Sequence, residues 1–188
     1  MKKETTKKFP KVFLDKSTIH GQGLFAGEKI KEGRRIIEYK GEKIPSGEGT
    51  VRSTEHEVIT YIFTLNDKYD VDGAVNGNEA RFANHSCDGN IYVDIIRGKI
   101  WLFAEHDIDK NEELTYDYSL DADDLLGCQC GAKRCRGYMN DAEDKRVKQA
   151  LKKKRAKAKK TKAENKAKKT KANKKAKDAK QTGKKKKS

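Results

Sequence analysis

Short apolar runs alternate with polar, glycine-containing segments through the first 120 residues. The runs lie at 11–14, 24–26, 34–42, 59–65, 69–73, 91–96, 99–104 and 112–118. Most are rich in β-branched and aromatic residues, a composition typical of strands. Arg97-Gly98, between two of these runs, predicts a hairpin with a two-residue turn. No long helical periodicity precedes about residue 140, and the polar segment 45–58 predicts a loop or a short helix. The pattern therefore predicts a mostly β domain built of small sheets.

The C-terminal part of the chain has a different composition. No Leu, Ile, Val, Met or aromatic residue follows Leu151. From Lys145 to Ser188 there are 23 Lys+Arg and 2 Asp+Glu, a net charge of +21. The whole chain has 44 basic and 29 acidic residues, so residues 1–144 hold 21 basic and 27 acidic residues, a net charge of −6. Without apolar surface to bury, the arm cannot offset an ordering entropy of ~1–2 kcal/mol per residue. We expect residues 141–188 to be a disordered arm that becomes partly helical on a polyanion.

The charge of this arm suggests partners. It resembles the tails of linker histones and histone-like nucleoid proteins, and such arms bind phosphates without sequence preference. Residues 145–188 are therefore expected to contact nucleic acid, and "KKKRAKAKK" (152–160) also matches a weak nuclear-localisation pattern. A solvated tail that only increases solubility is the alternative.

Four cysteines are the main candidates for metal ligands. No apolar run reaches the ~18–20 residues of a membrane span, and "MKKETTKKFP" lacks the apolar segment of a signal peptide. We therefore expect a reducing compartment and no membrane partner, so that metal ligands or buried thiols are favoured over disulfides. Cys128, Cys130 and Cys135 form a C-x-C-x4-C cluster, and Cys87 lies upstream. Four thiolates suit a closed structural zinc site, with an iron–sulfur cluster as the alternative.

Two further patterns have both a structural and a functional interpretation. Gly21-x-Gly23 predicts either a hairpin turn or a close approach of the backbone to a ligand. Tyr116 and Tyr118 are separated by one residue, so on a strand both side chains would face the same side. The same holds for Tyr61 and Phe63. Such pairs usually pack in a core. A slot lined by tyrosines also suits lysine, because ring faces attract an ammonium group and an apolar wall lowers the pKa of the amine.

Six segments occur in the order found in SET-domain protein-lysine methyltransferases. They are "HGQGLFA", "ITYIF", "VDG", "RFANHSCDGN", "ELTYDY" and "CQCGAKRCRG". The chain resembles this family over about residues 10–140, and the last segment resembles the post-SET zinc motif. The resemblance implies a β-clip of small curved sheets with a pseudoknot formed by the fourth and fifth segments. It also implies a division into a flexible N-terminus (1–9), a SET domain (10–120), a post-SET zinc segment (121–140) and a disordered Lys-rich tail (141–188).

The same resemblance implies the site residues. S-adenosylmethionine would contact His20, Gly21, Gln22, Gly23, Arg81, Phe82, Asn84, His85 and Tyr118. Tyr118 would orient the amine, Tyr61 would line the lysine channel, and Tyr116 stands where tyrosine restricts the product to mono- or dimethyl-lysine. One structural zinc ion would be held by Cys87, Cys128, Cys130 and Cys135.

The function implied is methyl transfer from S-adenosylmethionine to the ε-amine of lysine in a histone or histone-like basic protein. The chain's own tail is a second basic substrate, because an acidic body attracts basic peptides. The alternative is an inactive SET scaffold whose tail binds nucleic acid. The expected location is a nucleus or a nucleoid; for a bacterial protein it is the cytoplasm, or a host nucleus after delivery. Gly89 replaces a usual Pro, and Asn111 replaces a common Gly whose left-handed geometry Asn tolerates.

Overall fold

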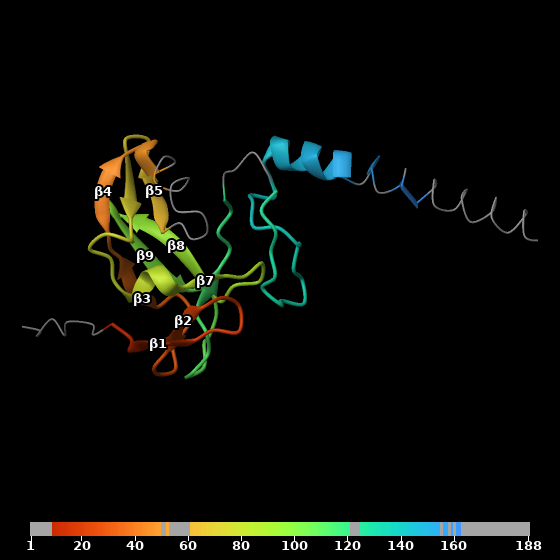
Figure 1. Cartoon of the computed structure of the whole chain (residues 1–188). Coiled ribbons are helices and arrows are strands. Elements are labelled where there is room, and N and C mark those ends of the chain that lie inside the picture. Colours follow the sequence, from red (N-terminus) through yellow and green to blue (C-terminus); the bar gives the residue numbers. More distant parts are fainter. Residues whose placement is uncertain are drawn as a thin grey trace, which may run out of the picture. The chain divides into compact units, whose positions relative to one another are not determined.

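Short strands predominate in the part of the chain that the structure describes. The computed structural model describes residues 9–49, 52, 61–120, 125–154, 156, 157, 159, 161 and 162. It divides into one unit of Met1–Leu120 with Leu126–Met139 and another of Asp121–Leu125 with Asn140–Ser188. Among the described residues, no helix has the length and apolar character needed to cross a membrane. The prediction of a mostly β domain of small sheets is confirmed (Figure 1).

Four small sheets make up the described part of the first unit (Figure 1). An antiparallel pair is formed by β1 (Val12–Lys16) and β2 (Gln22–Ala26). One three-stranded sheet has the order β3 (Arg35–Tyr39), β9 (Lys99–Ala104), β8 (Ile91–Ile96). The other has the order β4 (Glu42–Pro45), β6 (Tyr69–Asp72), β5 (Ile62–Asn66). A parallel pair is formed by β7 (Asn84–His85) and β10 (Thr115–Tyr116), and a 3-10 turn, η1 (Glu79–Phe82), precedes β7.

The apolar core is centred on β9, the middle strand of its sheet. Residues 100–104 are all buried, so both faces of β9 are covered, since successive side chains point to opposite faces. Leu24, Ile36 and Leu114 pack into the same core and are at most 1% exposed. Full burial of such a side chain contributes about 1.5–3 kcal/mol. The core therefore joins β2, β3, β9 and the segment before β10 into one body.

Two predicted turn geometries are confirmed. Arg97 and Gly98 connect β8 to β9 with φ values of 52° and 72°. Both φ values are positive, as required for the two-residue hairpin turn whose twist matches that of the flanking strands. Asn111 also has a positive φ, 69°, so its left-handed conformation agrees with the sequence expectation.

Two predicted strands differ clearly from the observed ones. The run 34–42 is divided between β3 and β4, and β4 extends into the start of the predicted loop. The division falls at Gly41, where a Cβ would lie 2.2 Å from the Asp72 carbonyl oxygen, so the chain crosses β6 too closely for a side chain. The run 112–118 retains only β10, because the Tyr118 N–H donates to a side chain instead of to a strand. Residues 59 and 60 of the run 59–65 and most of the loop 45–58 lie outside the described residues.

The first part of the basic arm is helical, although we expected disorder from residue 141. Residues 145–154 form a helix in the second unit. Asp144 caps it: its Oδ1 accepts the Arg146 N–H at 2.6 Å and its carbonyl accepts the Lys148 N–H at 3.0 Å. Lys, Arg and Ala also have high helix propensity. Residues 163–188 and 1–8 lie outside the described residues, so disorder there stays a prediction.

Candidate active site and metal centre

The parallel β7–β10 pair brings two distant segments of the sequence together. Asn84 pairs with Thr115 and His85 with Tyr116, and the Ser86 N–H donates to the Tyr116 carbonyl at 3.0 Å. At Gly89 a Cβ would lie 2.4 Å from the Thr115 carbonyl oxygen and 2.7 Å from the Tyr116 Cα. A side chain does not fit there unless backbone moves. The "NHSC" and "ELTYDY" segments therefore lie side by side, as the resemblance implies.

The glycine turn between β1 and β2 is tied to the same pair. The Asn84 amide nitrogen donates to the carbonyl oxygens of His20 at 3.2 Å and Gln22 at 3.0 Å. It also lies 2.8 Å from Glu113 Oε1, which accepts the Ser17 hydroxyl at 2.7 Å. A Cβ on Gly23 would lie 2.4 Å from Glu113 Oε1. The second glycine thus permits a close approach within the chain itself, and residues 20–23 are held against Asn84.

Six aromatic side chains form a cluster beside this pair, which we call the aromatic cluster: Tyr39, Tyr61, Phe63, Phe82, Tyr116 and Tyr118. The centroid of the Tyr116 ring lies 4.7 Å from that of Tyr118 and 5.8 Å from that of Phe63. Tyr39 packs on Phe63 at 4.9 Å and donates its hydroxyl to the Tyr61 carbonyl at 2.7 Å. The structure therefore brings together the three tyrosines that the sequence singled out. Tyr39 was missed, because an aromatic residue in a strand gave no signal beyond packing.

The hydroxyl groups of Tyr116 and Tyr118 are neutral at physiological pH. Burial raises the pKa of Tyr116 and of Tyr118 above the ordinary tyrosine value, and Tyr61 and Glu113 raise that of Tyr118 further. Tyr118 donates its hydroxyl hydrogen to the Ala83 carbonyl at 2.9 Å. Its oxygen can therefore accept a hydrogen bond from an incoming group, but it does not act as a base.

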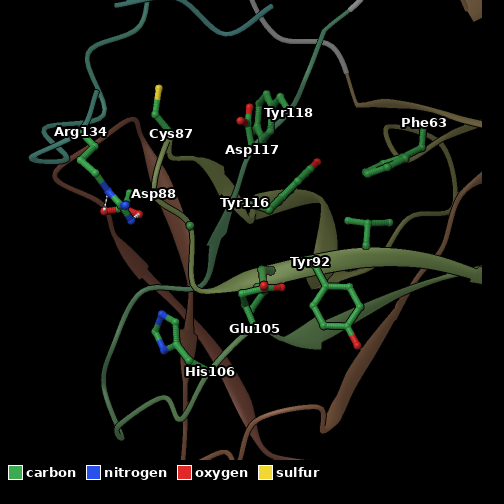
Figure 2. Close-up of a pocket in the computed structure, with 13 residues that line it drawn as sticks. Phe63, Cys87, Asp88, Tyr92, Glu105, His106, Tyr116, Asp117, Tyr118 and Arg134 are labelled. Carbon is green, nitrogen blue, oxygen red and sulfur yellow. Dashed lines mark hydrogen bonds and ion pairs between the residues drawn. The ribbon is translucent and has the colours of Figure 1, made fainter. Parts of the chain in front are cut away.

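An open cavity of about 760 Å³ adjoins Tyr116 and Tyr118. The ring of Tyr116 points into the space between Phe63 and Tyr118, as Figure 2 shows. Carboxylates line the cavity as well as rings: Asp88, Glu105 and Asp117. The aromatic faces favour a cationic ligand, whereas Asp88 and Asp117 are already paired with Arg134 and Arg136.

Arg81 and Phe82, which follow the start of η1, lie next to Tyr61. The Arg81 guanidinium is 4.8 Å from the centroid of the Phe82 ring and 5.6 Å from that of the Tyr61 ring. It donates to the Gly73 carbonyl at 3.2 Å, while its Nε is buried without a hydrogen-bond partner. Arg81 thus borders the aromatic cluster on the side of η1.

The four cysteines converge on one point. Cys128 Sγ lies 3.7 Å from the Sγ atoms of both Cys87 and Cys135, and the Cys130 thiol interacts with those of Cys128 and Cys135. Four sulfurs at ~2.3 Å from a tetrahedral metal are ~3.8 Å apart, so the donor set fits such an ion. The backbone N–H groups of Arg136, Cys130 and Gly137 each point at a cysteine sulfur at 3.4 Å. We call these four residues the cysteine cluster.

His85 adds a nitrogen beside this cluster. Its ligand atom and those of Cys87, Cys128 and Cys130 all lie within 4.8 Å of one another. Burial lowers the pKa of the His85 side chain, against the opposing effect of Asp117. The sequence did not indicate that the His85 side chain would reach the cysteines.

Two arginines attach the 126–139 segment to the rest of the unit. Arg134 binds Asp88 at 2.5 Å, and Arg136 forms a two-pronged ion pair with Asp117, with one contact at 2.9 Å. Two-pronged guanidinium–carboxylate pairs fix orientation as well as distance. Asp117 lies between Tyr116 and Tyr118, so this pair connects the segment to the aromatic cluster.

Comparison with known proteins agrees with this geometry. The family model of the SET domain matches residues 21–119, more than half of the chain. Histone-lysine N-methyltransferase trithorax of Drosophila virilis is 43% identical over 146 residues, which cover 73% of this chain and 4% of that protein. Histone-lysine N-methyltransferase 2B of Homo sapiens is 40% identical over 148 residues, 73% of this chain and 5% of that protein. This chain therefore belongs to the SET domain family, and it spans only a small part of the length of these relatives.

Solved structures of polycomb repressive complex 2 are also similar to this chain. The crystal structure of Chaetomium thermophilum polycomb repressive complex 2 matches with a TM-score of 0.56 and 36% identity, over 61% of this chain and 16% of that one. The structure of ctPRC2 in an autoinhibited conformation bound to S-adenosylmethionine matches with a TM-score of 0.54 and 39% identity, over 59% and 15%.

Metal content tests the cysteine cluster. Cys128 contacts two other thiols, so Cys128→Ser removes a central ligand, and we expect the bound metal to fall from about one ion per chain to well below one. Plasma mass spectrometry of the purified protein measures this. Lys133→Ala, which changes a nearby basic side chain and no thiol, serves as the matched control. Full metal content in Cys128→Ser would contradict a site centred on these sulfurs.

Proposed function

We propose that this protein transfers a methyl group from S-adenosylmethionine to the ε-amine of lysine in a histone or histone-like basic protein. The observation that carries the proposal is the buried, neutral Tyr118 within the aromatic cluster, in a chain of the SET family. Relatives at 40% identity and above that are named histone-lysine N-methyltransferases support it. The alternative of an inactive scaffold has no such observation in its favour.

The aromatic cluster suits the substrate side chain. Ring faces hold an aliphatic stem and attract its ammonium group, and both Tyr116 and Phe63 line the cavity. An apolar environment lowers the pKa of the amine, which favours the neutral, nucleophilic form. The Tyr118 oxygen then accepts a hydrogen bond from the amine and orients it. Water takes the proton of the lysine ammonium group, because the Tyr116 and Tyr118 phenols stay protonated and cannot act as bases. The rate gain comes chiefly from positioning the amine against the methyl group.

S-adenosylmethionine supplies an already activated methyl group. Residues 20–23 would contact it through their backbone, with Arg81 and Phe82 alongside. The amide nitrogen of Asn84 and both ring nitrogens of His85 already have partners within the chain. Asn84 and His85 would therefore contribute mainly backbone groups, and Asn84 its amide oxygen. A solved relative bound to S-adenosylmethionine, with 39% identity, supports this cofactor.

We assign zinc to the cysteine cluster. Four thiolates complete a tetrahedral zinc ion and leave no open position, so the ion would have a structural role. It would hold the 126–139 segment, and thus Arg134 and Arg136, next to the site.

The charge distribution favours a basic protein substrate and a chromatin-like location. Residues 1–144 carry a net −6 and residues 145–188 a net +21. The body attracts a basic peptide, while the arm binds the phosphates of nucleic acid and also offers lysines as a second substrate. We place the protein at chromatin in a nucleus or, in a bacterium, at the nucleoid.

Methyl transfer tests the main proposal. Purified protein is incubated with labelled S-adenosylmethionine, alone and with core histones, and mass spectrometry maps methylated lysines on both. We expect Tyr118→Phe to lower the transfer rate about 100-fold, because one positioned polar group in an active site is worth about that factor.

Tyr69→Phe is the matched control, since Tyr69 is exposed on β6 and its loss of a hydroxyl should leave transfer unchanged. Metal-loaded protein that binds no S-adenosylmethionine would refute the enzyme and favour the scaffold. Equal rates in Tyr118→Phe and the unaltered protein would refute the role of Tyr118.

The degree of methylation depends on Tyr116. The Tyr116 ring lies 4.7 Å from that of Tyr118. Its hydroxyl would hold a water molecule where a further methyl group would go, so the unaltered protein should yield mainly mono- and dimethyl-lysine. Tyr116→Phe is expected to shift the product distribution towards trimethyl-lysine, read by mass spectrometry over a time course. An unchanged distribution would remove Tyr116 from this role.

Salt dependence tests the arm. For the full chain, log K for duplex DNA should fall linearly with log salt, with a slope of about −0.9 for each phosphate neutralised. Replacing Lys152, Lys153 and Lys154 by Gln should reduce the slope by up to about 3, roughly one for each phosphate that a lysine no longer neutralises. DNA binding that is unaffected by salt would argue for a tail that only increases solubility.

A further inference from the structure

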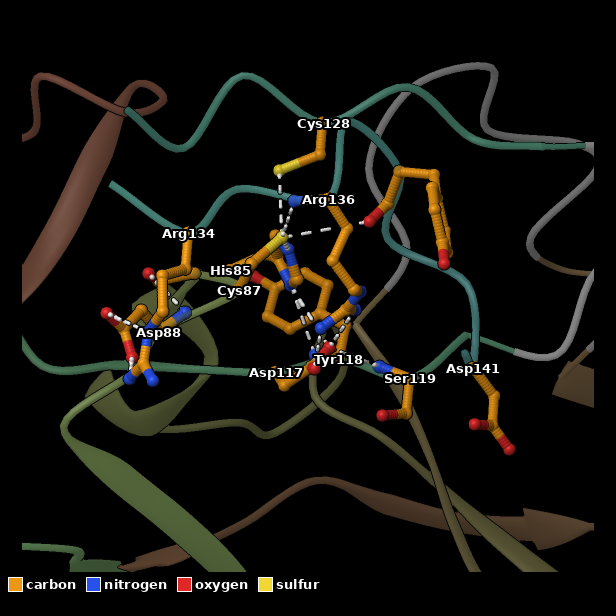
Figure 3. A network of polar contacts seen from close by, with 12 residues as sticks. His85, Cys87, Asp88, Asp117, Tyr118, Ser119, Cys128, Arg134, Arg136 and Asp141 are labelled. Atoms are coloured by element: carbon orange, nitrogen blue, oxygen red, sulfur yellow. Dashed lines mark hydrogen bonds and ion pairs between the residues drawn. The ribbon is translucent and has the colours of Figure 1, made fainter. Parts of the chain in front are cut away.

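The imidazole of His85 joins the cysteine cluster to Tyr118 (Figure 3). Its Nδ1 lies 3.1 Å from the Tyr118 backbone nitrogen, which donates to it. Its Nε2 lies 3.3 Å from Cys87 Sγ. The side chain is 4% exposed, so these protein groups replace water as its partners. One buried ring thus contacts a metal-binding sulfur at one end and the backbone of the proposed catalytic tyrosine at the other.

The geometry determines which ring nitrogen carries the hydrogen. A backbone N–H is always a donor, so Nδ1 must accept from Tyr118 and cannot carry a hydrogen itself. A neutral imidazole has one N–H, and it therefore lies on Nε2. That N–H faces Cys87 Sγ and donates to it. Asp117 Oδ1 is farther from Nδ1, at 3.8 Å, and is engaged by Arg136.

The same reasoning excludes His85 as a metal ligand in this arrangement. A metal on Nε2 would use its lone pair and leave the ring hydrogen on Nδ1. Two N–H groups would then face each other across the 3.1 Å between Nδ1 and the Tyr118 nitrogen. Cys135, whose sulfur lies 3.7 Å from that of Cys128, completes the set without this conflict. His85 is therefore a neighbour of the ligands.

We propose that His85 is a positioning residue that makes the placement of Tyr118 depend on metal in the cysteine cluster. A bound metal holds the Cys87 sulfur in one position, and the sulfur in turn orients the ring through Nε2–H. The oriented ring presents Nδ1 to the Tyr118 N–H. Tyr118 gains this anchor where strand pairing has ended, since β10 stops at Tyr116. The effect on turnover rests on the proposed methyl transfer; the tautomer and the metal linkage do not.

A parallel connection runs through Arg136. Its backbone N–H points at Cys87 Sγ at 3.4 Å, and its guanidinium holds Asp117, the residue before Tyr118. Both connections begin at Cys87 and end on the segment 117–118. Loss of metal would therefore loosen the backbone of Tyr118 from two sides.

Imidazole nitrogen NMR of the metal-loaded full chain tests the tautomer. We expect His85 with a protonated Nε2 and an unprotonated, hydrogen-bonded Nδ1. A hydrogen on Nδ1, or a metal-bound Nε2, would overturn the proposal. Amide hydrogen exchange gives a second readout: chelation of the metal should speed exchange of the Tyr118 amide at least about tenfold, and unchanged exchange would also overturn it.

Two substitutions separate the two hydrogen bonds of the ring. His85→Asn places an amide oxygen near the position of Nδ1 and cannot reach Cys87. His85→Gln places an amide nitrogen near the position of Nε2 and leaves no acceptor at Nδ1. We expect His85→Asn to weaken metal binding about 10–100-fold with near-normal kcat at saturating metal, and His85→Gln to lower kcat about 10–100-fold with near-normal metal binding.

Equal effects of both variants on both quantities would overturn the division of roles and indicate a general packing defect. If the unaltered protein transfers no methyl group, the proposed function fails, while the tautomer, the metal affinities and the Tyr118 amide exchange still decide this proposal.

Discussion

The parallel pairing of β7 with β10 is the constraint on which the site depends. Only two residues pair on each side, so the contact is short, but it fixes the register of every neighbouring group. Asn84 then reaches the glycine turn, His85 reaches the Tyr118 backbone, and Cys87 is carried towards the cysteines after residue 126. Gly89 permits the close approach, because a Cβ there would collide with backbone. The cofactor, lysine and metal positions proposed above all adjoin this one crossing.

Two ion pairs and the proposed metal connect the 126–139 segment to the β7–β10 pair. This segment has few buried apolar side chains, so its attachment relies on the sulfur cluster and on the pairs of Arg134 with Asp88 and Arg136 with Asp117. Surface ion pairs contribute little by themselves. A metal held by four thiolates would contribute far more, so the proposed ion would be the main determinant of order in this segment. The closeness of the cluster to Tyr118 is the reason that a structural ion could influence catalysis.

Much of the site was predictable from motifs. The part that was not predictable involves side chains whose partners come close only when the chain has folded. The structure brings together the four cysteines and also Tyr61, Tyr116 and Tyr118, while the roles expected for them stay predictions. Glu113, whose carboxylate accepts hydrogen bonds from Ser17 and Asn84, was not anticipated. Asp117 was not anticipated as the partner of Arg136 either. Their only signal was a place beside a motif residue. A carboxylate in a strand pattern does not reveal its partner, because the partner lies about 20 to 100 residues away in the sequence.

The sequence by itself determined the small-sheet β architecture, the hairpin turn at Arg97-Gly98, the left-handed Asn111 and the family. These depend on local periodicity, turn chemistry and motif order, which a linear chain displays directly. Only the tertiary structure decided that the run 34–42 is two strands, that residues 145–154 are helical, and that the His85 ring faces Cys87 and Tyr118. Each of these depends on a contact or a cap whose geometry exists only after folding: the close crossing at Gly41, the carboxylate of Asp144 at a helix start, and the direction of two ring nitrogens in a buried space.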